Sequence, residues 1–351
     1  MALVQLSPIT KKRLARFRSH RRGYWSLWIL CVVYLMSLGA ELLIGSRAVF
    51  VAYQGHWYFP ALTNRYYAET LFGGELDLEA DFRLLVADAK FKAAGGTIVM
   101  PPHPYSPLET VVIEGDRPPA APTWGHPLGT DDRGRDILAR LVYGFRISMT
   151  FAIGLTAVAI AVGCVLGAIQ GFFGGRVDLT MQRLTEIWAA LPFLYVVILI
   201  SSILTPNFWL LLCILLLFQW IGVSRYIRAE FLRERNLEYV SAARALGIPT
   251  PRIMLLHITP NALTPVVTLA PFLVVSAIFS LASLDFLGFG LPAPTPSWGE
   301  LFKQGQGQIT AWWLTLSPFF ALFTTLLLTT FVGEAIRDAW DPKAATYAGP
   351  K

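Results

Sequence analysis

Histidine, lysine and glycine are the residue types from which a metal site or a phosphate-binding loop could be built in this chain. No lysine follows a glycine, so the Gly-Lys-Ser/Thr step of a P-loop is missing. Gly288-Phe289-Gly290 adjoins an apolar run and lacks the pattern of a phosphate cradle. The histidines are scattered, without the spacing of paired helical metal ligands: His20, His56, His103, His126 and His257. We expect no catalytic residue and no metal site, with metal binding by residues 45–123 left open.

A short segment of small residues is the most specific pattern in the chain. It reads Glu238-Tyr239-Val240-Ser241-Ala242-Ala243-Arg244-Ala245-Leu246-Gly247 and is followed by His257-Ile258-Thr259-Pro260-Asn261. At helical spacing Tyr239, Ala242, Ala243 and Leu246 share one face, with Gly247 one turn beyond Ala243. Glu238, Ser241 and Arg244 lie toward the other side, and Pro249 and Pro251 end the helix. Such a face would let another backbone approach closely; the alternative is an ordinary helix between two membrane spans.

Composition indicates an integral membrane protein. The 351 residues are 54% hydrophobic and 15% charged, with a mean hydropathy of +0.52. Asp, Glu, Lys and Arg are missing from residues 147–175, 187–224, 253–284 and 304–333. A spanning helix needs roughly 20 apolar residues, so the second run holds two spans and the others one each. With residues 24–44, six transmembrane helices are predicted.

The distribution of basic residues predicts the topology. Basic residues without any acidic residue precede the first span, which places the N-terminus in the cytoplasm: Lys11, Lys12, Arg13, Arg16, Arg18, Arg21 and Arg22. This segment is either an amphipathic helix on the membrane surface or a disordered tail. Six spans then put the C-terminus and the arginine-rich loop of residues 224–257 in the cytoplasm as well. No cleaved signal peptide is expected, because the first apolar run is too long.

Residues 45–123 form a predicted extracytoplasmic insert of α+β type. Residues 49–60 are expected to form two short strands around the turn at Gln54-Gly55. Residues 80–92 are expected to form an amphipathic helix whose core-facing residues are Phe82, Leu85, Val86 and Phe91. The predicted order is a basic segment (1–23), a first span (24–44), the insert (45–123), a five-helix core (124–341) with the loop at about 230–261, and a tail (342–351).

The small-residue segment resembles the EAA motif of ABC importer permeases, in which it forms a coupling helix held by the ATPase subunit. Ser241 stands where that family usually has Glu, and Thr259 where it often has Leu. Whether Ser241 weakens the contact with the ATPase, or is compensated by Glu238, is left open.

Further motifs extend the resemblance over residues 124–341, in the order found in dipeptide and oligopeptide permeases. Residues 126–136 and 141–148 are similar to the stretch before the second span, and residues 171–178 to the turn after it. Residues 284–300 are similar to the outer loop after the fifth span. Residues 21–28 and 55–60 are similar to the Yej-type importers of oligopeptides and microcin C.

The resemblance implies an all-α polytopic protein with the type I ABC importer permease fold. The implied partners are a second homologous permease in a heterodimer, an ATPase with two nucleotide-binding domains or two copies, a periplasmic peptide-binding protein and the bacterial inner membrane. ATP and Mg would bind to the ATPase, and no cofactor to this chain. The coupling residues it implies are Glu238, Tyr239, Ser241, Ala242, Ala243, Arg244, Leu246, Gly247, Ile258 and Pro260. The outer gate or interface residues it implies are Asp131, Asp132, Arg133, Gly134, Arg135, Asp136, Asp285, Phe286, Gly288 and Trp298.

Three other function classes compete with the peptide importer. A secondary transporter or channel usually carries ionisable residues within its spans, and the second to sixth predicted spans have almost none. An ABC exporter subunit has no need of a folded outer domain that receives a binding protein. A sensor that binds a ligand through the insert is a third possibility. A co-purifying ATPase would distinguish the importer from these.

Overall fold

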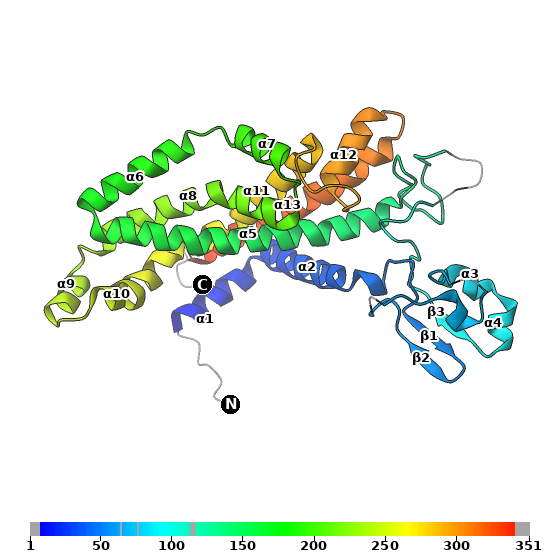
Figure 1. Ribbon diagram of the computed structural model, residues 1–351. Coiled ribbons are helices and arrows are strands. Elements are labelled where there is room, and N and C mark those ends of the chain that lie inside the picture. Colours follow the sequence, from blue (N-terminus) through cyan, green and yellow to red (C-terminus); the bar gives the residue numbers. More distant parts are fainter. Residues whose placement is uncertain (1–7, 64, 76, 112, 114–116, 341–351) are drawn as a thin grey trace. The chain divides into compact units, whose positions relative to one another are not determined.

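A computed structural model describes residues 8–63, 65–75, 77–111, 113 and 117–340 (Figure 1). Within these residues the chain divides into two compact units. The helical unit comprises 8–31, 148–292 and 323–340, and the insert-bearing unit comprises 32–147 and 293–322. The predicted tail, residues 342–351, lies outside the described residues.

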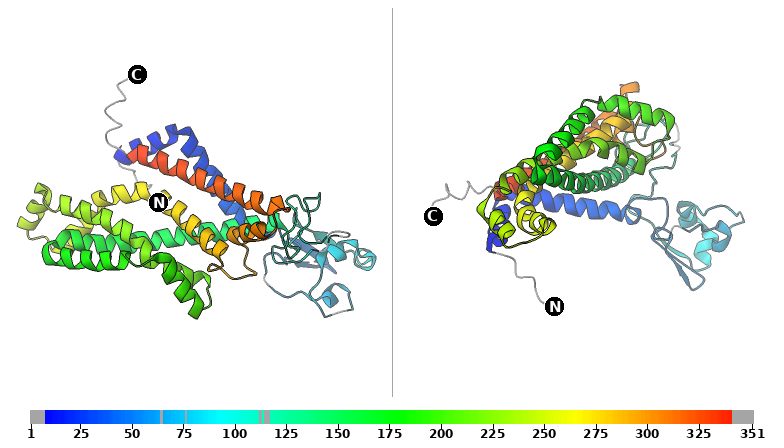
Figure 2. Two further views of the ribbon diagram at one scale, coloured as in Figure 1. Left: turned by 90° about the horizontal axis from the view of Figure 1, so that it is seen from above. Right: turned by 60° about the vertical axis from the view of Figure 1, so that its left-hand side comes forward.

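Helices make up the helical unit. Its elements are α1 (Pro8–Ser19), the start of α2 (Arg21–Leu38), most of α5 (Ile137–Phe173), α6 (Gly175–Ala189), α7 (Phe193–Ile203), α8 (Phe208–Glu234), α9 (Glu238–Ala245), α10 (Thr250–Arg252), the π-helical turn η3 (Ile253–Ile258), α11 (Thr259–Leu287) and the end of α13 (Trp312–Trp340). Within this unit α9 and α10 lie beside the last turns of α5 and α8 in both views (Figures 1 and 2).

Fewer helices than predicted are long and apolar enough to count as membrane spans in the described part of the chain. By length and composition, four helical stretches can cross a membrane: α5, α8, the continuous stretch Thr250–Leu287 and α13. The α6–α7 pair, bent by 70°, would be a fifth if it is one broken span. The six predicted spans are therefore not confirmed in the described part of the chain. The first has only 18 helical residues, including Arg21 and Arg22, and the third is interrupted before Pro192.

Three glycines at four-residue spacing bring α5 against α8. Gly163, Gly167 and Gly171 face α8 so closely that a Cβ on Gly167 would lie 2.5 Å from the Ser224 carbonyl oxygen. A Cβ on Gly171 would lie 2.5 Å from Cβ of Phe231. Small residues at such spacing allow helices in a membrane to approach until their backbones touch. The α5–α8 pair is therefore the close-packed scaffold of this unit.

Replacing Gly167 with leucine should destabilise the helical unit by about 1–3 kcal/mol, because the added atoms have no space beside α8. Gly222 on α8 is the matched control, since nothing lies within 4 Å of a Cβ placed there. Thermal unfolding of the detergent-solubilised chain, followed by tryptophan fluorescence, measures both. Equal melting temperatures for Gly167→Leu and Gly222→Leu would contradict the close packing.

The insert-bearing unit holds a three-stranded antiparallel sheet with the order β2-β1-β3. Its strands are β1 (Phe50–Tyr53), β2 (His56–Tyr58) and β3 (Thr97–Val99). Its helical elements are η1 (Ala40–Leu42), η2 (Glu69–Phe72), α3 (Phe82–Ala87), α4 (Ala89–Ala93), α12 (Trp298–Gly307), the end of α2 and the starts of α5 and α13. A core of Val51, Tyr53, Phe72, Phe82 and Phe91 lies under the sheet.

The local predictions for the insert are confirmed in part. The hairpin forms around Gln54 and Gly55, which both have positive φ angles. The predicted helix is two helices, because Asp88 caps the second by accepting a hydrogen bond from the Lys90 N–H. Phe82, Leu85 and Phe91 are buried as predicted, but Val86 is exposed.

Candidate functional site

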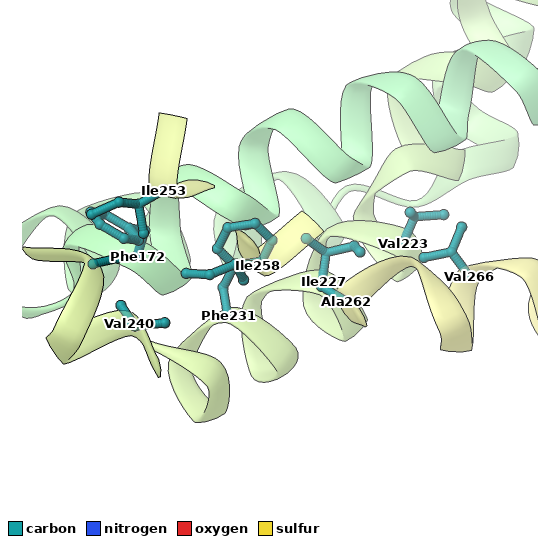
Figure 3. Packing of buried hydrophobic residues seen from close by; sticks show 10 residues of the cluster. Phe172, Val223, Ile227, Phe231, Val240, Ile253, Ile258, Ala262 and Val266 are labelled. Atoms are coloured by element: carbon teal, nitrogen blue, oxygen red, sulfur yellow. The ribbon is translucent and has the colours of Figure 1, made fainter. Parts of the chain in front are cut away.

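The small-residue segment forms α9, and one side of it is anchored in a buried apolar cluster. Val240 and Ala243 of α9 contact Phe231 of α8 and Ile253 and Ile258 of η3 in this cluster. Figure 3 shows Val240, Phe231 and Ile258 pointing toward one another between the ends of these helices. The cluster continues along α8 and α11 through Val223, Ile227, Ala262 and Val266. The orientation of α9 is therefore determined by the same packing that holds α8 to α11.

The predicted single face of α9 is corrected by this packing. Ala243 is buried together with Val240, whereas Tyr239, Ala242 and Leu246 are on the exposed side. Leu246 follows the last turn of α9 with 79% of its surface exposed, next to the exposed Tyr239 and Ala242. The surface open to a partner is thus a small apolar patch. Its flanking residues Glu238, Ser241 and Arg244 are also exposed.

Gly247 ends α9, whereas Pro249 and Pro251, which were predicted to end it, cap and begin the next helix, α10. The φ angle of Gly247 is +73°, and the Ile248 N–H donates to the Ala243 carbonyl while the Gly247 N–H donates to that of Arg244. These two bonds form a Schellman motif, for which glycine is favoured. Nothing lies within 4 Å of a Cβ at Gly247, so close approach within the chain does not require glycine there.

A buried carboxylate at the end of α8 joins the elements of the loop. Glu234 is 5% exposed and accepts hydrogen bonds from the Tyr239 hydroxyl at 2.5 Å and from Nη2 of Arg233 at 3.0 Å. The Asn261 side chain, in the first turn of α11, hydrogen-bonds to both Glu234 and Tyr239. Burial, and then the bond to Glu234, raise the pKa of Tyr239, which keeps its hydroxyl a donor. Glu234, rather than Glu238, is the acidic residue that organises this loop.

Two arginines attach the loop to the end of α5. Nη1 of Arg235 donates to the Phe172 carbonyl at 3.1 Å, and the Arg244 guanidinium lies 5.3 Å from the centre of the Phe172 ring. The adjacent turn has φ angles of +62° at Gly174 and +53° at Gly175. Asp178 in α6 then binds Arg228 of α8 through both oxygens, at 2.5 and 2.7 Å.

The return to the membrane passes through the π-helical turn η3. The Met254 carbonyl accepts both the backbone N–H of Thr259, in the wide spacing of a π-turn, and the Thr259 hydroxyl at 2.8 Å. Ile258 is fully buried in the cluster, and Pro260 is exposed in the first turn of α11. Leu255 and Leu256 of η3 are exposed, as Leu246 is.

Removing the Tyr239 hydroxyl tests the anchoring of α9. In Tyr239→Phe the buried Glu234 carboxylate loses one hydrogen-bond donor, which should destabilise the packed position of α9 by about 1–3 kcal/mol. We expect the α9 amides to exchange hydrogen about tenfold faster or more in the detergent-solubilised chain. Tyr226→Phe, which changes an exposed tyrosine of α8, is the control. Unchanged exchange rates in α9 would refute an anchoring role for Glu234.

The predicted outer residues divide between the two units. Within the insert-bearing unit, Asp131, Arg135 and Asp136 are buried, whereas Asp132 and Arg133 are exposed. Gly134 has a φ angle of +76° in the turn between them. Trp298, also buried, donates its indole N–H to the Leu141 carbonyl at 3.1 Å.

A buried ionic network connects the start of α5 with α12. Nε of Arg135 donates to Asp131 at 2.7 Å, and its Nη2 donates to Glu300 at 3.0 Å. Nη2 of Arg140 donates to the second oxygen of Glu300, and the Arg140 side chain is 0% exposed. Burial opposes the charge of Arg135, but Asp131 and Glu300 raise its pKa above the usual value. The predicted outer residues Asp131 and Arg135 therefore also hold the start of α5 to α12.

Asp136 is shared by two histidines. Its oxygens lie 2.9 Å from Nε2 of His103 and 2.7 Å from Nδ1 of His126. Burial alone would raise the pKa of Asp136, but bonds from His103, the Ala139 N–H and His126 lower it. The Asp136 carboxylate thus links His103, which follows β3, to the start of α5. No group of three metal-binding side chains with suitable geometry occurs in the described part of the chain.

Asp285, Phe286 and Gly288 belong to the helical unit. Oδ1 of Asp285 accepts from the Leu291 N–H at 2.7 Å, and Gly288 ends α11 with a φ angle of +87°. They therefore shape the turn after α11.

Several site residues escaped the analysis of the sequence. Glu234 precedes the run of small residues by which the motif is recognised, and Val240 interrupts that run, so neither was predicted. The four-residue spacing of Gly163, Gly167 and Gly171 was a detectable signal. Arg140 and its partner Glu300 lie 160 positions apart, and no local pattern connects them.

The chain is similar to known transport proteins. Residues 159–346 match the family described as "Binding-protein-dependent transport system inner membrane component". The chain is 44% identical over 341 residues to the inner membrane ABC transporter permease protein YejE of Escherichia coli (strain K12), covering 97% of this chain and 99% of that one.

Two further relatives carry substrate names. The peptidoglycan transport system permease protein YejE of Agrobacterium fabrum is 41% identical over 361 residues, covering 96% of this chain and 94% of that one. The oligopeptide transport system permease protein OppC of Haemophilus influenzae is 38% identical over 227 residues, covering 64% and 73%.

Proposed function

The chain belongs to the family of inner membrane components of binding-protein-dependent transport systems, and from this premise we propose that it is a permease subunit of an ATP-driven oligopeptide importer. Two relatives are named for peptidoglycan transport and oligopeptide transport, which supports oligopeptides as cargo, and the resemblance to Yej-type importers adds microcin C-like peptides to the proposal. The chain forms half of a pore with the type I permease fold, crosses the membrane six times, and has both termini in the cytoplasm. It hydrolyses nothing itself.

The observation that carries the coupling role is the two-sided character of α9. Its inner side is locked to α8, η3 and α11 by Val240, Ala243 and Glu234, while Leu246 extends outward. A force applied to the outer side is therefore passed to α8 and α11 rather than absorbed by a loose loop. The partner ATPase, which holds ATP and Mg in two nucleotide-binding domains or two copies, would apply it and switch the pore between two rigid-body states.

The remaining partners follow from the same proposal. A second, homologous permease completes the pore as a heterodimer, and a periplasmic peptide-binding protein delivers the cargo. The outer loops with Asp131–Asp136 and Asp285–Gly288 lie on the periplasmic side and border the outer gate. The insert, residues 45–123, faces the same side and provides a contact for the binding protein.

Placing a charge on the exposed side of α9 tests the coupling site. Leu246→Asp should abolish or reduce at least tenfold the co-purification of the ATPase, because an aspartate is costly in an apolar contact. The chain should still insert and unfold at the normal temperature, since Leu246 packs against little of its own chain. Leu84→Asp, at an exposed leucine of α3, is the control. Normal ATPase recovery with Leu246→Asp would contradict the assignment.

Excising the sheet and helices of the insert tests its role. The Val49 N–H bonds to the Val99 carbonyl at 2.8 Å, so residues 50–98 can be replaced by two glycines without moving the flanking chain. This deletion keeps His103 and Asp136. We expect lost stimulation of ATP hydrolysis by the binding protein, with unchanged basal hydrolysis in reconstituted transporters. Full stimulation would show that the insert does not contact the binding protein.

A further inference from the structure

We propose that α1 binds anionic phospholipid headgroups of the cytoplasmic leaflet through Lys11, Lys12 and Arg18. This inference rests on the proposed cytoplasmic N-terminus. It concerns a surface outside the coupling loop, and the proposed partner is the lipid phosphate.

The apolar side of α1 is already occupied within the chain. Phe17 is buried against Ala335 and Ala339 of α13, and the Arg13 guanidinium lies 5.4 Å from the centre of the Trp340 ring. Figure 2 shows α1 beside the C-terminal end of α13. Of the two sequence-based alternatives, the disordered tail is contradicted because residues 8–19 are helical, and the helix turns Phe17 to α13 instead of to lipid. What α1 offers to its surroundings is therefore chiefly charge.

The side of α1 away from Phe17 is cationic. At 100° per residue, Lys11, Lys12 and Arg18 lie more than a quarter-turn from Phe17, and all three are exposed. The helix has no acidic residue, and no ion pair with these three occurs in the described part of the chain.

Arg21 and Arg22 are less available than these three cations. They line a cavity of about 470 Å³ together with His20, Glu334 and Asp338, so acidic side chains partly balance them. Nε2 of His20 lies 3.7 Å from Asp338. The unbalanced charge is therefore concentrated on α1 itself.

The aromatic residues next to α1 in the chain indicate that the anion bound by α1 is a lipid headgroup. Trp25 and Trp28 at the start of α2 are exposed and lie 5.8 and 6.3 Å from the Tyr24 ring. Such aromatic groups sit at the level of lipid headgroups. Only His20 separates the end of α1 at Ser19 from the start of α2 at Arg21, so α1 is connected to the chain at the level of these aromatic residues. Each Lys or Arg near an anionic leaflet strengthens binding about fivefold.

The test compares lipid binding by the full chain and a charge variant. Phosphatidylglycerol or phosphatidylcholine is added to the chain in neutral detergent, and bound lipid is counted by native mass spectrometry. The variant Lys11→Gln/Lys12→Gln/Arg18→Gln should bind phosphatidylglycerol at least tenfold more weakly than the wild type. Arg65→Gln/Lys90→Gln/Lys92→Gln, which removes the same charge from the insert, should bind normally.

A charge-conserving variant separates electrostatics from misfolding. Lys11→Arg/Lys12→Arg/Arg18→Lys should bind phosphatidylglycerol as the wild type does, and added salt should weaken binding to both. Equal affinity of the glutamine variant and wild type would overturn the proposal. Unchanged lipid binding with loss of the ATPase would instead assign these cations to the ATPase. The lipid measurement needs no ATPase, so its result stands apart from that of Leu246→Asp.

Discussion

Close packing of the ends of α5, α8, η3 and α11 is the constraint on which the functional loop depends. Gly171 allows α5 to reach Phe231, and Phe231 then meets Val240 and Ile258 in one buried cluster. Because α9 has only eight residues, it could not hold an orientation by itself. Its outward surface is thus a consequence of helix packing in the scaffold.

Polar contacts complete what apolar packing begins. Glu234 joins the end of α8 to α9 and to the first turn of α11, and Arg235 and Arg244 bind the end of α5 through Phe172. A buried carboxylate is stable only when its hydrogen bonds are made, so these elements must keep one relative arrangement. That requirement suits a loop whose proposed task is to transmit force.

The insert-bearing unit uses charge in a similar way. Asp131, Arg135, Arg140 and Glu300 form a network with little access to water, and Asp136 is bonded by His103 and His126. The pairs connect segments far apart in the sequence. Residues that family resemblance associates with an outer gate therefore maintain the fold at that end of α5.

Local chemistry in the sequence was sufficient for the membrane class, the helix at α9, the hairpin at Gln54-Gly55 and most of the insert core, because each depends on neighbours along the chain. Tertiary structure alone decided which side of α9 is buried, since a helix of small residues has no strongly apolar face to reveal it. It also decided that Glu234 rather than Glu238 is the organising acid, and that Gly247 serves a backbone turn. Contacts between distant segments, such as Arg140 with Glu300, leave no periodic signal, so only packing could reveal them.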